Sequence, residues 1–204
     1  MTTLTAEGCS VVELRQYTLR PGKCDVLIEL FEREFVDAQE SQGMYLFGQF
    51  RDLTDPDRFV WLRGFADMES RREALNAFYT GPVWQAHRDV ANGTMIDSDN
   101  VLLLRPDKAF GHRPSSRLLM TICHPAGSID EFQQLLADCR EQPIATFETE
   151  HAENTFPVLP VRTGESVVVW FSYETAALDP NLLSHLKNPA DQRLLEPTPT
   201  SHLR

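Results

Sequence analysis

A histidine stands in the segment FYTGPVWQAHRDVAN (78–92) where general-base chemistry is feasible. Trp84 and His87 are three residues apart, so on a helix they share one face, and Arg88 stands beside the histidine. An imidazole at the mouth of an aromatic cavity can abstract an acidic C–H or O–H proton from a substrate. We therefore take His87 as the candidate catalytic base. The alternative is structural, with His87 and Arg88 near the C-terminal end of a helix and Trp84 as a packing anchor.

The same segment supplies groups that could hold a substrate. Tyr79 and Trp84 could frame it, and either Arg88 or Arg15 could stabilise an enolate as its negative charge develops. This combination predicts proton abstraction without a cofactor.

A second group of candidates follows from alternation along VVELRQYTLR (11–20), which is typical of a half-buried strand. Val12 and Leu14 point to one face, which we expect to lie under helices. Glu13, Arg15 and Tyr17 point to the other face.

A later strand, RFVWLRGF (58–65), puts Phe59, Trp61, Arg63 and Phe65 on a single face. We expect these side chains, with those of the first strand, to line a cavity inside a barrel, where a partly apolar ligand would bind. The predicted binding residues are Arg15, Tyr17, Trp61, Arg63, Tyr79, Trp84 and Arg88. In the alternative interpretation, Glu13 and the arginines form an exposed ladder of salt bridges and the aromatic residues fill the core.

The first half of the chain reads as strand, helix, strand, strand, helix, strand. A strand over 11–20 precedes a helix with an apolar stripe that ends at Gly43, and strands over 44–53 and 58–65 form a hairpin. Helical segments follow, interrupted at Gly81-Pro82, and the strand NVLLLR (100–105) ends at Pro106. This order is that of a ferredoxin-like βαββαβ unit.

The second half repeats the beginning of this order. The strand RLLMTICH (117–124), a Pro-Ala-Gly turn and a helix follow at an offset of 104 to 105 residues, and a hairpin and an apolar tail come after them. We predict an α+β chain of two tandem units: a domain over 1–106, a linker over 107–115 and a divergent domain over 116–204. One unit alone would expose a large apolar sheet face, so the two are expected to close an intrachain barrel that dimerises further.

The composition excludes several classes of protein. The net charge is −11, and residues 1–105 and 106–204 carry −6 and −5, so neither half is a basic binder of nucleic acid or anionic membrane. The sequence shows no transmembrane run, no leader pattern and no C-x-x-C, which predicts a cytoplasmic protein with reduced thiols.

The sequence also lacks the usual cofactor and metal motifs. Neither a P-loop nor G-x-G-x-x-G occurs, and G-x-S-x-G and H-E-x-x-H are absent too. Glu148 and Glu150 share one face of a strand, whereas His151 and Glu153 lie on the other. We expect neither a cofactor nor a metal site.

Three stretches carry a resemblance to a known family. VVELRQYTLRPGK (11–23), FYTGPVWQAHRDVAN (78–92) and the tail LEPTPTSHLR (195–204) together resemble NIPSNAP proteins, most clearly over the first hundred residues. The resemblance implies the dimeric α/β-barrel superfamily of ferredoxin-like units, whose members include cofactor-free monooxygenases, isomerases, decarboxylases and haem enzymes. It implies no settled activity, since the family has none.

Three functional hypotheses follow. The first is a NIPSNAP-like protein that binds a small, partly apolar molecule in a barrel cavity. The second is a cofactor-independent enzyme, monooxygenase- or isomerase-like, that acts on an aromatic or polyketide-like substrate with His87 as base. The third is a scaffold whose faces only build an oligomer, and a homodimer is expected in each case.

Overall fold

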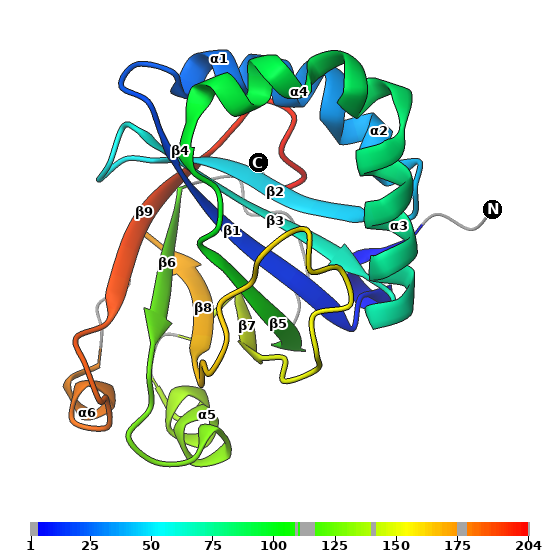
Figure 1. Cartoon of the computed structure of the whole chain (residues 1–204). Helices are drawn as coiled ribbons and strands as arrows, with labels where there is room; N and C mark the ends of the chain where they lie inside the picture. Colours follow the sequence, from blue (N-terminus) through cyan, green and yellow to red (C-terminus); the bar gives the residue numbers. More distant parts are fainter. Residues whose placement is uncertain (1–3, 109, 111–116, 140–141, 175–178, 204) are drawn as a thin grey trace.

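Antiparallel strands close into a barrel, and helices cover its outside (Figure 1). The structure is a computed structural model that describes residues 4–108, 110, 117–139, 142–174 and 179–203. The first half contains η1 (Ala6–Gly8), β1 (Val11–Leu19), α1 (Cys24–Leu30), η2 (Phe31–Phe35), α2 (Val36–Glu40), β2 (Tyr45–Asp52), β3 (Arg58–Phe65), α3 (Met68–Thr80), α4 (Pro82–Thr94), β4 (Met95–Asp97) and β5 (Val101–Lys108). The second half contains β6 (Leu118–Cys123), α5 (Ile129–Ala137), β7 (Ala145–Thr149), β8 (Val168–Tyr173), α6 (Pro180–Leu183) and β9 (Asp191–Pro197).

The barrel is a closed ring of eight strands in the order β3-β2-β9-β6-β8-β7-β5-β1, because β1 also pairs with β3. The short β4 adds to β1 outside this ring. Within each half, the four ring strands lie side by side, as β5-β1-β3-β2 and as β7-β8-β6-β9. The two halves meet at β2–β9 and at β5–β7, so neither half closes the ring alone.

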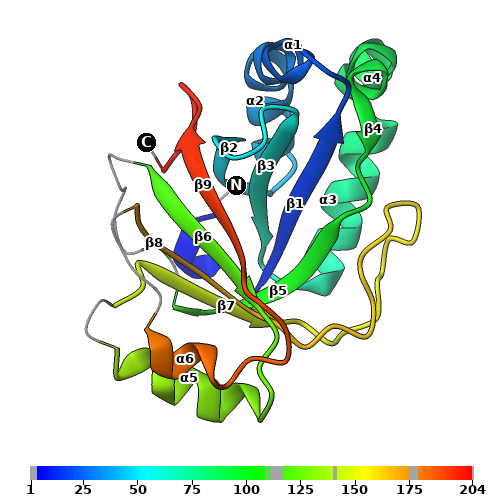
Figure 2. The ribbon, with the colours of Figure 1, turned by 90° about the vertical axis from the view of Figure 1, so that its left-hand side faces the viewer.

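The helices of the two halves lie on opposite outer sides of the barrel. α1, α2, α3 and α4 cover β1 and β3, whereas α5 and α6 lie beyond the second half (Figure 2). Gly81-Pro82 separates α3 from α4 as expected, since proline occupies the first turn of α4. Ser128 caps α5 in a capping box with Glu131.

The interior of the barrel is apolar and packed. Every strand of the ring contributes to one buried cluster, which includes Val12 and Leu14 from β1, Phe147 from β7 and Phe171 from β8. The buried Asp52 of β2 lies opposite Leu195 of this cluster and forms ion pairs with Arg58 and Arg193.

On both β1 and β3, the face that was predicted to line the barrel lies under the helices, and the opposite face lines the barrel. Val12 and Leu14 face the barrel interior, not the helices as we expected from the alternation. Tyr17 and Trp61 instead pack in the cluster between the sheet and the helices of the first half. The expected grouping on one face is correct, but that face lies under the helices and does not line the inside of the barrel.

The ends of two predicted segments also differ. β5 continues past Pro106 to Lys108, because Pro106 and Lys108 pair with β7. Most of the predicted linker, residues 109 and 111–115, lies outside the described residues. The apolar tail, which suited an edge strand, forms β9 and lies between β2 and β6.

Among the described residues, the longest helices, α3 and α4, have 13 residues each, and no helix is long and apolar enough to cross a bilayer.

Leu195 tests whether β9 is an integral part of the barrel. It is fully buried in the interior cluster, and its strand pairs with β2 and β6. Leu195→Ala should lower the free energy of unfolding by about 2–5 kcal/mol, because it opens a cavity in a closed core. Urea denaturation measures this loss. Leu194→Ala, at the half-buried neighbouring position, is the control and should cost much less. Equal stability of Leu195→Ala and the wild type would contradict the closed barrel.

Candidate functional site

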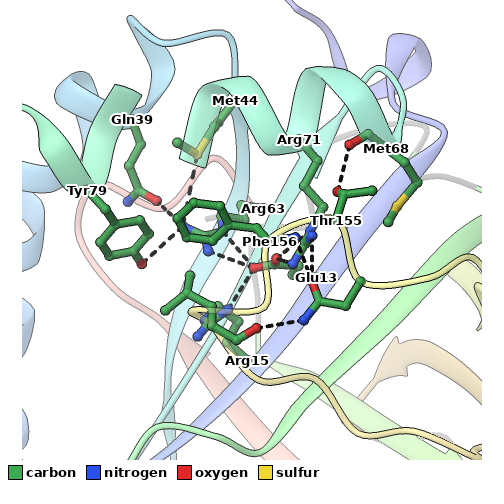
Figure 3. Close-up of polar contacts among 12 residues, drawn as sticks. Glu13, Arg15, Gln39, Met44, Arg63, Met68, Arg71, Tyr79, Thr155 and Phe156 are labelled. Atoms are coloured by element: carbon green, nitrogen blue, oxygen red, sulfur yellow. Dashed lines mark hydrogen bonds and ion pairs between the residues drawn. The ribbon is translucent and has the colours of Figure 1, made fainter. Parts of the chain in front are cut away.

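The carboxylate of Glu13, in the middle of β1, is shared by three arginines (Figure 3). Its Oε2 accepts hydrogen bonds from Nη1 of Arg15 at 2.7 Å and from Nε of Arg63 at 2.8 Å. Its Oε1 accepts one from Nε of Arg71 at 2.7 Å. Glu13, Arg63 and Arg71 are completely buried and Arg15 is 2% exposed, so this ion cluster lies out of water.

Strand register and one helix bring these charges together. Glu13 and Arg15 share a face because they are two residues apart on β1, and Glu13 lies directly opposite Arg63 on β3. Arg71 comes from the first turn of α3, whose N-terminus is capped by the side chain of Asp67. The cluster thus joins two neighbouring strands to the helix that covers them.

Burial and charge act in opposite directions on the pKa of Glu13. Burial raises it, but the positive charges of Arg63, Arg15 and Arg71 outweigh burial and hold it well below its ordinary value of 4.5. Glu13 is therefore ionised at neutral pH. Burial also raises the pKa of Tyr17, and this outweighs the opposing charge of Arg15, so its phenol is neutral there.

The arginines make further contacts with neutral partners. Nη1 of Arg63 donates to Oε1 of Gln39 on α2 at 2.8 Å and lies 3.5 Å from the hydroxyl of Tyr79. Nη1 of Arg71 donates to Oδ1 of Asn154 at 3.0 Å. Nε of Arg15 donates to the hydroxyl of Tyr17 at 2.9 Å.

Asn154 belongs to the loop over 150–167, which connects β7 to β8 and reaches across to the first half (Figure 1). Thr155 donates its hydroxyl to the backbone oxygen of Met68 at 3.0 Å. Phe156 stacks on Tyr79 with ring centroids 6.2 Å apart and an angle of 23° between the rings (Figure 3). The second half of the chain therefore completes the site that the first half begins.

A cavity opens beside the ion cluster, between the sheet and the helices. Its empty volume is about 520 Å³, which includes its opening to solvent. It is lined by Arg15, Tyr17, Leu27, Phe31, Phe35, Gln39, Trp61, Phe78, Tyr79, Trp84, Asn92, Met95, Ser98 and Leu159. Phe31 and Phe35 lie on a π-helical turn, a local irregularity that often marks functional sites.

Two donors on the cavity wall have no partner among the described residues. Trp61 is only 2% exposed, and its buried Nε1 makes no hydrogen bond with a described residue. Arg15 uses Nη1 on Glu13 and Nε on Tyr17, whereas its Nη2 makes no hydrogen bond or ion pair with a described residue. A buried donor without an acceptor is costly, so Nε1 of Trp61 is suited to bind a ligand. Arg15 lines the same cavity, so its Nη2 is a second donor that a ligand could use.

Five of the predicted site residues line this cavity: Arg15, Tyr17, Trp61, Tyr79 and Trp84. Arg63 lies behind the wall, in the ion cluster. His87 and Arg88 are not among the described residues that line the cavity. His87 is 30% exposed and its Nε2 lies 3.4 Å from Oε2 of Glu34, while Arg88 is half exposed and lies beside Asp89.

Four residues of the site are not predicted from the sequence: Gln39, Arg71, Asn154 and Leu159. Arg71 lies in the segment MESRREA (68–74), where charges look like the solvated face of a helix. Asn154 and Leu159 lie in a loop that contacts distant parts of the sequence, such as Arg71, which is 83 residues before Asn154. No local pattern marks either position. Among the described residues, no group of three or more His, Cys, Asp and Glu side chains is placed to hold a metal ion.

Glu13→Gln tests the ion cluster at neutral pH. The substitution leaves three buried guanidinium groups without their carboxylate, so we expect the free energy of unfolding to fall by about 3–5 kcal/mol at pH 7. Glu29→Gln is the control, because Glu29 is 79% exposed and, among the described residues, forms an ion pair with Arg33 alone. Urea denaturation that finds the same stability in both variants would contradict the role of the cluster.

The pH dependence gives a second prediction with a fixed sign. Because the pKa of Glu13 is lower in the folded state than its ordinary 4.5, its contribution is complete above pH 4.5 and is lost as the pH falls further. The difference in stability between the wild type and Glu13→Gln should therefore shrink below about pH 4.5. A difference that stays constant from pH 7 to pH 3 would argue against an ionised Glu13.

Comparisons with known proteins agree with this fold. The sequence model of the NIPSNAP family matches residues 12–109. No match is found among the curated proteins. Over nearly the whole chain, the structure is similar to a proposed monooxygenase from Lactobacillus acidophilus, with a TM-score of 0.59, 12% identity and coverage of 93% of this chain and 94% of that one.

Two further solved structures are similar. One, a proposed monooxygenase from Fusobacterium nucleatum, has a TM-score of 0.58, 9% identity and coverage of 93% and 92%. The other, a NIPSNAP family protein from Agrobacterium tumefaciens, is 26% identical, with a TM-score of 0.44, and covers 47% of this chain and 91% of its own. At such identities the two whole-chain matches show the fold alone. The matched segment contains β1, β3, α3 and the arginines around Glu13. The first half of this chain, residues 12–109, thus belongs to the NIPSNAP family, whose proteins have no established function.

Proposed function

We propose that this protein binds a small, partly apolar molecule in the cavity between the sheet and the helices of its first half. The observation that carries the proposal is the indole of Trp61, which lines the cavity, is 2% exposed and has no acceptor for its Nε1 among the described residues. A ligand that accepts this hydrogen bond would satisfy a donor that the protein itself leaves unpaired.

The composition of the wall supports the same proposal. Aromatic and aliphatic side chains predominate, with few polar groups, and this is the usual composition of small-molecule sites. Arg15, Tyr17, Trp61, Tyr79 and Trp84 are the proposed binding residues, with Arg63 as a positioning residue behind them.

The enzymatic hypothesis, with His87 as general base, is less well supported. A general base must come within hydrogen-bond reach of its substrate. His87 contacts Glu34 and packs beside the ring of Phe35, and it is absent from the described lining of the cavity. We therefore propose binding without a catalytic role for His87 or a binding role for Arg88.

We also propose that the fold consists of two ferredoxin-like units, 1–106 and 116–204, joined by 107–115. Numbered within each half, the ring strands lie in the order 4-1-3-2, and this order supports the proposal. A homodimer and a cytoplasmic location remain predictions from the sequence.

Native mass spectrometry of protein purified from its own host tests the proposed binding. We expect an additional mass on the wild type that is lost on denaturation. In Trp61→Phe the occupancy should fall, because loss of one buried hydrogen bond weakens binding by about tenfold.

Val90→Ala serves as the control for that measurement, since Val90 lies on α4 and is 53% exposed. It should keep the additional mass. A wild type that carries none would contradict the proposal. If His87→Ala lost the mass while Trp61→Phe kept it, the histidine hypothesis would replace the cavity defined by Trp61.

A further inference from the structure

The ion cluster beside the cavity has more positive than negative charge, and we infer from this that the ligand is an apolar monoanion with a carboxylate held by Arg15. The inference rests on the proposed function and adds the chemical class of the ligand. It is supported by the charges of the described residues, by the unpaired Nη2 of Arg15 and by the composition of the cavity wall.

The buried side chains of the ion cluster carry more positive than negative charge. Arg15, Arg63 and Arg71 are all at most 2% exposed, and Glu13 is the one carboxylate within ion-pair distance of them among the described residues. Tyr17 is neutral because burial raises its pKa. The cluster therefore carries two uncompensated positive charges, although the whole chain is strongly acidic at −11.

Uncompensated buried charges are costly in free energy, so a buried guanidinium group needs a stabilising partner. Aromatic rings supply part of it: the guanidinium of Arg15 lies 5.6 Å from the ring centroid of Trp61, and that of Arg63 lies 5.0 Å from the same centroid. Such rings attract a cation, but they bring no negative charge. A monoanion would supply one of the two missing negative charges.

Arg15 is the arginine of the cluster at which we expect the anion to bind. Arg63 and Arg71 direct their donors to Glu13, Gln39 and Asn154, and neither lines the cavity as described. Arg15 does line it and has Nη2 unpaired. Nε1 of Trp61 is a second free donor on the same wall, so a carboxylate could accept from both.

The apolar cavity wall favours a monoanion with an apolar body. Leu27, Phe31 and Phe78 make the rest of the wall apolar, and a strongly hydrated dianion such as phosphate would lose its water there without replacement. One guanidinium faces the cavity, which suits one negative charge. A planar carboxylate on an apolar or aromatic body fits both conditions.

Benzoate and benzamide make a suitable pair of probes, because they have the same size and differ in charge. In thermal unfolding at constant ionic strength, benzoate should raise the Tm of the full-length protein more than benzamide does. Titration by calorimetry should give benzoate at least about tenfold tighter binding, the ratio expected for a charge-assisted hydrogen bond.

Arg15→Gln should remove this preference. Arg33→Gln is the matched control, because it also removes one positive charge but from a side chain that is 57% exposed. The control should keep the preference for benzoate.

Gln39→Glu gives an independent readout that needs no ligand. Oε1 of Gln39 already accepts from Arg63 at 2.8 Å, so the substitution adds a carboxylate to the cluster with almost no change of size. It also removes the hydrogen bond that Nε2 of Gln39 donates to the backbone oxygen of Phe35 at 3.2 Å, a smaller effect than the added charge. The Tm of the ligand-free protein should rise, and the effect of benzoate should decrease. Gln42→Glu, at an exposed position after the same helix, should change neither.

The possible outcomes separate this inference from the proposed function. Equal binding of benzoate and benzamide would overturn the anion and leave a cavity that binds neutral molecules. A Tm that rises with inorganic phosphate but not with benzoate would overturn the carboxylate class. An effect of benzoate on Gln39→Glu as large as on the wild type, or no binding of benzoate, would overturn the inference, whereas the proposed function fails if host-purified protein retains no ligand.

Discussion

The salt bridges of three buried arginines to Glu13 are the interaction on which the first half of this protein depends. They join β1 to β3 and both strands to α3, at a point where water is excluded. A buried ion pair gains little net stability unless its hydrogen bonds are complete, so the surroundings must supply neutral partners. Gln39, Tyr79 and Asn154 do so, and they come from two helices and from the loop of the other half. The cluster thus explains why distant segments meet here.

The apolar core and the candidate site lie on opposite faces of the barrel sheet. The interior of the barrel is mainly an apolar cluster drawn from all eight ring strands, to which Asp52 adds ion pairs with Arg58 and Arg193. The ion cluster around Glu13 lies on the other face of the sheet, under the helices of the first half. The outer face of the second half is different: Phe132, Leu136 and Trp170 pack there with Cys123 and Val168, and the described residues form no comparable ion cluster. The two halves are therefore similar in strand order but differ in the side chains that lie under their helices. The second half contributes its loop, with Asn154 and Phe156, to the site of the first.

Alternation was sufficient to group Glu13, Arg15 and Tyr17 on one face of β1 and Trp61 with Arg63 on one face of β3. It could not tell which face lies inside, because both faces of β1 are buried and Val12 or Leu14 suits either environment. The order of strands and helices was also predictable from periodicity and turn residues. The position of β9 in the ring was not, since pairing between distant strands leaves no local pattern. Arg71 was missed for a related reason, as a helical arginine looks solvated until the fold buries it.

We infer that the ion cluster presents an open positive charge to the cavity at Arg15. A bromide soak of crystals of this protein, with anomalous diffraction, tests it without knowledge of the ligand, because bromide is a monoanion that scatters distinctively. We expect an ordered bromide in the cavity within contact distance of Nη2 of Arg15 and Nε1 of Trp61. Bromide found only on the outer surface, with Nη2 of Arg15 bonded to a protein carboxylate, would contradict it.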